Sequence, residues 1–133
     1  MESRAVHTSR KTIEVGGSRH TAPIPSGCRV GPLICSSALL GGEPTTGDVP
    51  DDGAEQTKLV FANLRSFLAE AGTGPECVAK VDVLLAPGES RDALNAEWER
   101  MFPDHEDRPA RHVTVQPLPR NFKIQLEVIG YAS

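Results

Sequence analysis

Residues 51–72 read DDGAEQTKLVFANLRSFLAEAG and contain the strongest helix signal of the chain. Asp51 or Asp52 can cap the helix N-terminus, because a carboxylate there accepts hydrogen bonds from free backbone N–H groups. Gly72 suits the position just after the last turn. The apolar residues recur at helical spacing and form one stripe, which comprises Val60, Leu64, Phe67, Leu68 and Ala71. The segment therefore predicts an amphipathic helix packed on another layer of structure.

Strand patterns lie on both sides of this helix. Alternating or apolar runs predict strands over 11–15, 33–40, 78–85, 111–115 and 122–128. Ser90 can cap a second helix, which Pro103 ends. Residues 22–31 contain Pro23 and Pro25 and predict extended chain that lies mostly outside the sheet. The order is β-β-α-β-α-β-β, with room for one more short strand near the N-terminus.

Two helices cannot cover both faces of such a sheet, so we expect them on one face, with Phe61 and Trp98 in the core beneath them. The other face is then either solvated or covered by another subunit. The predicted fold is an α+β sandwich, and oligomerisation is expected. At 133 residues the whole chain, 1–133, makes one domain. Residues 1–10 are polar and unpatterned, and we expect them to be flexible.

Composition excludes several functional classes. Fourteen basic and eighteen acidic residues give a net charge of −4, which argues against nucleic acid or an anionic membrane as the main partner. The three cysteines form no CxxC pair, and the histidines have no ligand spacing, so neither a disulfide framework nor a metal site is expected. The chain shows no signal peptide and no apolar run of membrane-spanning length, which predicts a cytoplasmic protein.

Arg111 is the first candidate for a functional residue. It shares strand parity with Val113 and Val115, so its side chain should leave the sheet on the valine side. An arginine kept partly out of water needs an anion, and its guanidinium fits a carboxylate in bidentate fashion. The alternatives are a structural ion pair, for example with Glu127, or a side chain that points into solvent. His112 has the opposite parity and can transfer protons near neutral pH, although a surface histidine is more often inert.

Three further residues interrupt apolar patterns. Ser36 and Ser37 lie in an apolar strand, where backbone hydrogen bonding is the simplest role for a hydroxyl. Asn95 lies in the second helix, where a side-chain bond to a loop is plausible. Cys35 is expected to pack as a small hydrophobe. Pattern alone thus yields an α+β domain with one unusual arginine.

An ordered set of short motifs runs from residue 22 to residue 131. The motifs are LICSS at 33–37, TGDVP at 46–50, AEAG at 69–72, RPAR at 108–111, LP at 118–119 and KIQLE at 123–127. On these motifs the chain resembles the RidA/YjgF family, also called L-PSP or translation-inhibitor endoribonuclease-like.

The resemblance implies a chorismate-mutase-like subunit in a homotrimer with three clefts between neighbouring subunits. Deaminating members hydrolyse reactive enamines and imines, such as 2-aminoacrylate, to keto acids and ammonia, without an organic cofactor or metal. Arg111 matches the arginine that holds the substrate carboxylate. Ser36 matches the strand serine, and Asn95 matches the asparagine of the second helix.

The chain departs from the family pattern on the last strand. Gln125 stands where deaminating members carry a glutamate, and glutamine can hold a water but cannot accept its proton. Glu127 shares a face with Gln125, about 7 Å along the strand, and could substitute only for a displaced substrate. His112 follows the arginine where a small hydroxyl residue is usual.

These residues together predict a divergent hydrolase of carboxylate-bearing enamines or imines. The expected catalytic residues are Arg111, Gln125 and Ser36. The expected substrate-binding residues are Arg111, Asn95, His112, Val113 and Glu127, with backbone N–H groups assisting the arginine. The alternatives are a tailoring or catabolic pathway enzyme with a different reaction in the same cleft, and a non-catalytic trimer that binds small carboxylates.

Overall fold

A computed structural model describes residues 9–133 and confirms both predicted helices. Helix α1 (Gly53–Glu70) begins at Asp52, whose carboxylate accepts a hydrogen bond of 3.1 Å from the Glu55 N–H. Helix α2 (Arg91–Met101) begins at Ser90, whose hydroxyl accepts from the Asp92 N–H at 3.0 Å. The side-chain caps therefore set the start of each helix as the sequence predicts.

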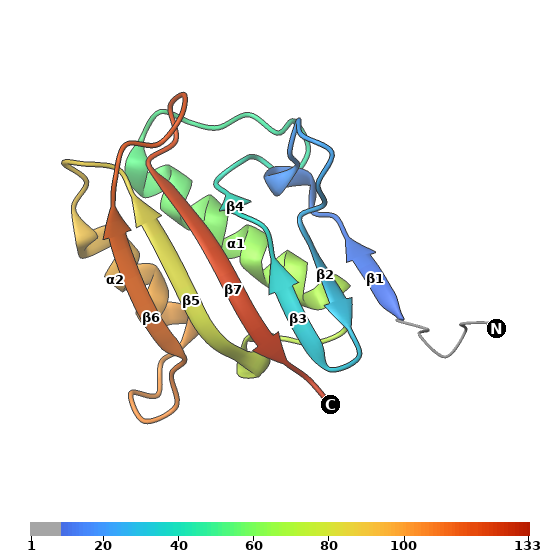
Figure 1. Cartoon of the computed structure of the whole chain (residues 1–133). Coiled ribbons are helices and arrows are strands. Elements are labelled where there is room, and N and C mark those ends of the chain that lie inside the picture. Colours follow the sequence, from blue (N-terminus) through green and yellow to red (C-terminus); the bar gives the residue numbers. More distant parts are fainter. Residues whose placement is uncertain (1–8) are drawn as a thin grey trace.

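Seven strands form one mixed sheet, shown in Figure 1. Their bounds are β1 (Arg10–Ile13), β2 (Gly27–Val30), β3 (Leu33–Ser36), β4 (Leu39–Leu40), β5 (Val78–Leu85), β6 (Ala110–Val115) and β7 (Ile124–Tyr131). The order across the sheet is β1-β2-β3-β7-β5-β6, and β4 also pairs with β7. Only the β5–β6 pair is parallel, and helix α2 supplies its crossover. Two short 3-10 turns, η2 (Gly16–Ser18) and η3 (Pro75–Cys77), complete the elements of the described chain.

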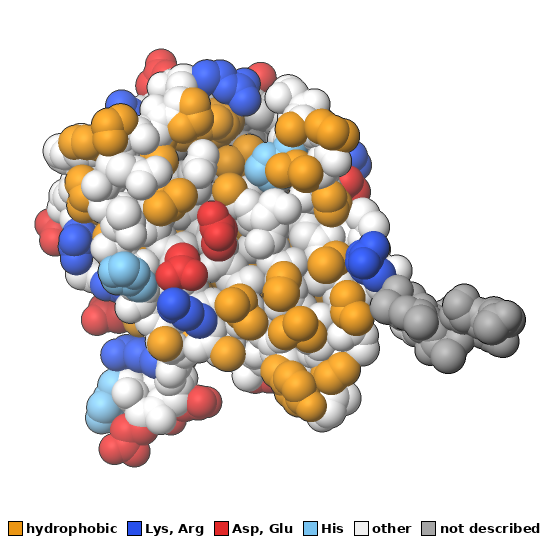
Figure 2. Space-filling view, in the orientation of Figure 1, with side chains coloured by type: hydrophobic (Ala, Val, Ile, Leu, Met, Phe, Trp, Pro, Cys, Tyr) orange, Lys and Arg blue, Asp and Glu red, His pale blue; other side chains and the backbone are white. Residues whose placement is uncertain are grey.

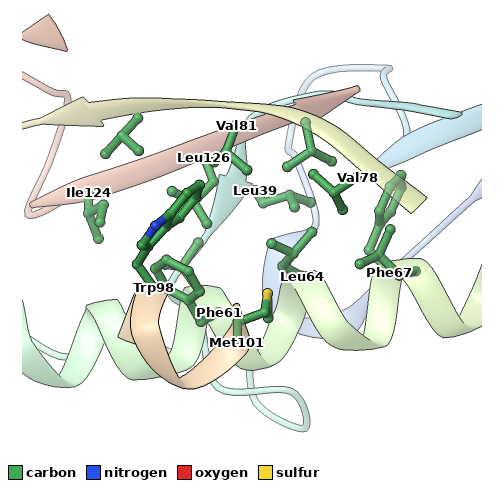
Figure 3. Packing of buried hydrophobic residues seen from close by; sticks show 14 of the residues in the cluster. Leu39, Phe61, Leu64, Phe67, Val78, Val81, Trp98, Met101, Ile124 and Leu126 are labelled. Carbon is green, nitrogen blue, oxygen red and sulfur yellow. The ribbon is translucent and has the colours of Figure 1, made fainter. Parts of the chain in front are cut away.

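Both helices lie on one face of the sheet, as predicted (Figure 1). The core fills the space between α1, α2 and the central strands, and Figure 3 shows its side chains converging there. Phe61 and Trp98 are buried in it, as expected from the sequence. The apolar stripe of α1 is buried along its whole length, and the helix packs against β4, β7 and α2. Among the residues described, no helix is long and apolar enough to cross a membrane.

The N-terminal third differs from the sequence prediction. The segment expected to lie mostly outside the sheet contains β2, which forms a hairpin with β3 across Gly31 and Pro32. Pro23 and Pro25 precede β2 and therefore do not interrupt its ladder. Gly31 adopts a φ of +57°, which a tight hairpin turn requires and glycine permits.

Two strand ends also differ from prediction. The single strand expected over 33–40 is divided into β3 and β4, and both pieces pair with β7. The flexible segment expected over 1–10 falls largely on residues 1–8, which lie outside the described residues, whereas Arg10 already belongs to β1.

The face without helices carries an apolar patch, made of Leu33, Ile129 and Tyr131, which are 45%, 45% and 63% exposed. Tyr131 pairs with Leu33, so these side chains meet across β3 and β7. Figure 2 shows apolar side chains gathered on this part of the open face. A contiguous apolar patch is typical of a surface that another protein covers. This is the face on which the sequence analysis expects either solvent or a second subunit.

Candidate functional site

Arg111 lies near the start of β6, the strand at one edge of the sheet. It pairs in register with Val81, which is fully buried on the helix side, so its side chain leaves the sheet on that side. Val113 follows on the same face and packs against the core. The structure therefore confirms the predicted parity of Arg111 with the valines of its strand.

The guanidinium of Arg111 lies over the indole ring of Trp98, with its central carbon 5.0 Å from the ring centroid. Such a cation–π contact orients the group without neutralising its charge. Its Nη1 atom is buried and has no hydrogen-bond partner within residues 9–133. Burial lowers the pKa of Arg111, and the positive charge of Arg91 lowers it further. The site thus holds a partly desolvated cation with a donor left free.

The alternative of an ion pair with Glu127 is wrong for this chain. Glu127 pairs with Asp82, whereas Arg111 lies level with Val81, so the two side chains leave opposite faces of the sheet. None of the salt bridges found within residues 9–133 includes Arg111. The guanidinium is consequently available to a carboxylate from outside the chain.

Gln125 lies far from Arg111 within one chain. It is half-buried on the open face of β7, where it pairs with Leu84 and Leu40. Arg111 is level with Val128 through Val81, three residues further along β7, which amounts to roughly 10 Å of strand. The single chain therefore does not bring its two main expected catalytic residues together.

A row of titratable side chains crosses the open face. Asp82 of β5 pairs with His112 of β6 on one side and with Glu127 of β7 on the other. The ammonium of Lys80 lies 3.5 Å from the Asp82 carboxylate. Figure 2 shows acidic, basic and histidine side chains close to one another on the open face. The structure thus brings together His112 and Glu127, both expected to bind substrate, around a third group.

Asp82 was not among the site residues expected from the sequence. The signal was present, because Asp82 alternates with the buried Val81 and Val83 and must therefore point to the open face. Its neighbours could not be inferred, since they depend on the register of three separate strands.

The hydroxyl of Ser36 accepts a hydrogen bond of 2.9 Å from the Val128 N–H. It completes the β3–β7 pairing where the two strands diverge, so it carries the backbone role that the pattern favoured. Asn95 is exposed on α2, and its amide has no hydrogen-bond partner in the part of the chain that the structure describes.

The main cavities of the chain lie elsewhere. One of them has a volume of about 470 Å³ and lies between η3, the end of α2 and the loop that leads to β6. Arg111 does not line it. The guanidinium lies at the edge of the sheet, and Arg111 lines none of these four cavities of the described chain.

Comparisons with known proteins agree with this architecture. The sequence model of the family described as endoribonuclease L-PSP matches residues 20–132. A 2-iminobutanoate/2-iminopropanoate deaminase of Escherichia coli is 31% identical over 130 residues, covering 96% of this chain and 97% of the relative. A RutC family protein of Haemophilus influenzae is 28% identical over 133 residues, covering 98% of each chain. The crystal structure of the YjgF gene product of Escherichia coli superposes with a TM-score of 0.80 at 28% identity, over 91% of this chain and 98% of that one.

Proposed function

Because this chain belongs to the endoribonuclease L-PSP family, the family of the RidA and YjgF proteins, we propose that it hydrolyses reactive enamines or imines that carry a carboxylate. The products are a keto acid and ammonia. The observation that carries the proposal is the Arg111 guanidinium, which is partly desolvated, stacked on Trp98 and free of any partner on Nη1 among the described residues. The deaminase name of the Escherichia coli relative supports the reaction class.

The proposed active site lies between subunits of a homotrimer. The side chain of Arg111 leaves the edge strand β6 on the helix side of the sheet. Gln125 lies on the open face near the start of β7. A ligand can contact both residues only if they come from different chains. The apolar patch of Leu33, Ile129 and Tyr131 supports the assembly, because association would remove its exposed surface from water.

In the proposed mechanism the enamine first tautomerises to an imine in water. Arg111 and nearby backbone N–H groups bind the carboxylate and fix the imine carbon in place. The amide of Gln125 holds a water, whose oxygen attacks that carbon and forms a carbinolamine. The nitrogen takes up the protons, the C–N bond breaks and ammonia leaves, so that imine and water give keto acid and ammonia.

Gln125 also favours a second candidate function. A glutamine cannot take the proton of the attacking water, so rate acceleration rests on orientation and electrostatics. A different reaction of a carboxylated substrate in the same cleft would not require a proton acceptor at residue 125. Binding without turnover would not require one either. Glu127 is the nearest carboxylate on the same face of β7.

The test couples the protein to a dehydratase that releases 2-aminoacrylate or 2-aminocrotonate and follows ammonia and keto acid. We expect acceleration by the wild type and its loss in Arg111→Ala. Arg100→Ala is the matched control, because Arg100 is an exposed arginine that pairs with Glu97 on α2. Gln125→Glu should increase the rate by supplying a base. Equal rates for wild type and Arg111→Ala, across several imines, contradict the proposal.

The split site has its own test. The Arg111→Ala and Gln125→Leu variants are unfolded together and refolded into mixed trimers. In some clefts of these trimers, one chain supplies Arg111 and its neighbour supplies Gln125. We expect activity above that of either variant refolded alone, and a trimer mass by light scattering. Monomers in solution, or no gain on mixing, contradict a site shared between chains.

We also place the protein in the cytoplasm. Cys28, Cys35 and Cys77 are all free thiols, as is usual in a reducing compartment.

A further inference from the structure

A second concave site lies away from Arg111, at the end of the sheet where β7 begins. Its volume is about 350 Å³, and its walls come from η2 and the residues after it, from the loop over 44–49, and from the turn that leads into β7. Two arginines line it, Arg19 and Arg120, which are about a hundred residues apart in the sequence. The fold thus gathers two cations around one hollow.

The charge of this cavity is one-sided. No carboxylate is among its lining residues, and neither arginine forms a salt bridge within residues 9–133. Asp48 of the same loop and Glu43, which immediately precedes it, line the neighbouring cavity instead. Both arginines are positively charged, so an anion bound in this cavity would be attracted to each of them.

Arg120 is held in an unusual conformation. Its φ is +52°, and it is the only residue other than glycine with a positive φ in the part of the chain described. Its guanidinium carbon lies 5.3 Å from the centroid of the Phe122 ring, which fixes the direction of the group. Backbone strain of this kind persists where the surroundings demand it and is concentrated at ligand sites.

The rest of the lining is suited to an organic group. Leu40, Val49 and Phe122 supply apolar surface, and Thr21 and Thr46 are among the polar residues of the lining. Gly17 presents bare backbone, because a side chain there would collide with the carbonyl of Gly42. A ligand with a charged head and a small apolar body matches both parts of the cavity.

We propose that this cavity binds a small phosphate monoester, with the phosphate between Arg19 and Arg120 and the apolar body on Leu40 and Phe122. A phosphate monoester carries nearly two negative charges at neutral pH, which balances two guanidiniums, whereas a monocarboxylate carries one. The inference does not rest on the proposed deamination, since Arg111 is not part of the cavity.

The experiment titrates phenyl phosphate into the protein at constant ionic strength and follows heat and amide chemical shifts. Arg19→Ala and Arg120→Gly each remove one guanidinium, and glycine also tolerates the positive φ, so this variant keeps the backbone. We expect each to weaken binding by about 10- to 100-fold, which is what one charge-assisted hydrogen bond contributes. Arg10→Ala, an exposed arginine of β1, and Arg111→Ala should bind as the wild type does.

Benzoate is the second probe and is titrated into Arg111→Ala, so that the proposed carboxylate site does not contribute. It should bind at least about tenfold more weakly than phenyl phosphate binds to the same variant, because it lacks the second charge. Three results overturn the inference: no saturable binding of phenyl phosphate, equal affinity in all four variants, or benzoate binding as tightly as the phosphate. Loss of binding in Arg111→Ala alone would place the anion in the other site and would also overturn it.

Discussion

Arg111 is predicted to reduce the stability of the folded chain. The perturbation is Arg111→Met, which keeps the length of the side chain and its packing on Trp98 but removes the charge and the N–H groups. A buried N–H without a partner costs about 1–3 kcal/mol. The cation–π contact that is lost contributes about 0.5–2 kcal/mol. The variant should therefore be more stable by about 1 kcal/mol, or roughly 3–5 °C in Tm for a chain of this size.

The lowered pKa of Arg111 also predicts that this residue destabilises the folded chain, and it predicts how that destabilisation depends on pH. Because burial lowers this pKa, the folded chain binds the proton less tightly than the unfolded chain does. The penalty is present at every pH below the lowered pKa and is lost only as the pH rises through it towards the unfolded value. The gain in Arg111→Met should thus stay constant between about pH 6 and pH 9.

Urea unfolding followed by far-UV circular dichroism, repeated at several protein concentrations, measures this difference. Pyruvate at about 100 times its Kd should stabilise the wild type by about 2.7 kcal/mol and leave Arg111→Met unchanged. A variant that is less stable than the wild type by more than about 2 kcal/mol would show that Arg111 is structural. The reasoning about a free guanidinium would then be refuted.

Three further variants test the local structure by the same urea assay. Asp52→Ala removes the cap of α1 and should cost about 1 kcal/mol, whereas Asp52→Asn should cost much less; equal losses would contradict the capping role. Ser36→Ala leaves the Val128 N–H without a partner and should cost about 1–3 kcal/mol; no loss would show that a water replaces the hydroxyl. Arg120→Gly should be more stable than Arg120→Ala by about 1 kcal/mol, because glycine adopts the positive φ without strain, and the reverse order would refute that strain.

Elements with strong local signals could be predicted from the sequence. Helix α1 has its cap, its stripe and its terminal glycine within one segment, and β7 has the clearest alternation in the chain. The β2 strand could not be predicted in this way, because its four residues, GCRV, are too few for an alternating pattern to stand out after Pro23 and Pro25. Its place depends on the turn at Gly31 and on a partner strand, and so on contacts that local pattern does not contain.

The candidate site could likewise be predicted from the sequence only in part. The side of the sheet on which Arg111 lies follows from its parity with Val113, and the structure confirms it. Gln125 alternates with the buried Ile124 and Leu126, and this alternation already indicates that its side chain leaves the opposite face of the sheet. Contacts such as that of Arg111 with Trp98 could not be foreseen, because they depend on how α2 crosses the sheet.

The position of β7 has a consequence for how the protein is made. This C-terminal strand lies in the middle of the sheet and joins the β1–β2–β3 hairpins to the β5–β6 pair. It is synthesised after the other strands of the sheet, so the two groups of strands made before it each keep an unpaired edge until β7 emerges from the ribosome. A chain interrupted before Ile124 would therefore carry the sheet in two separate parts, and a chaperone that shields open strand edges would find its substrate in that chain.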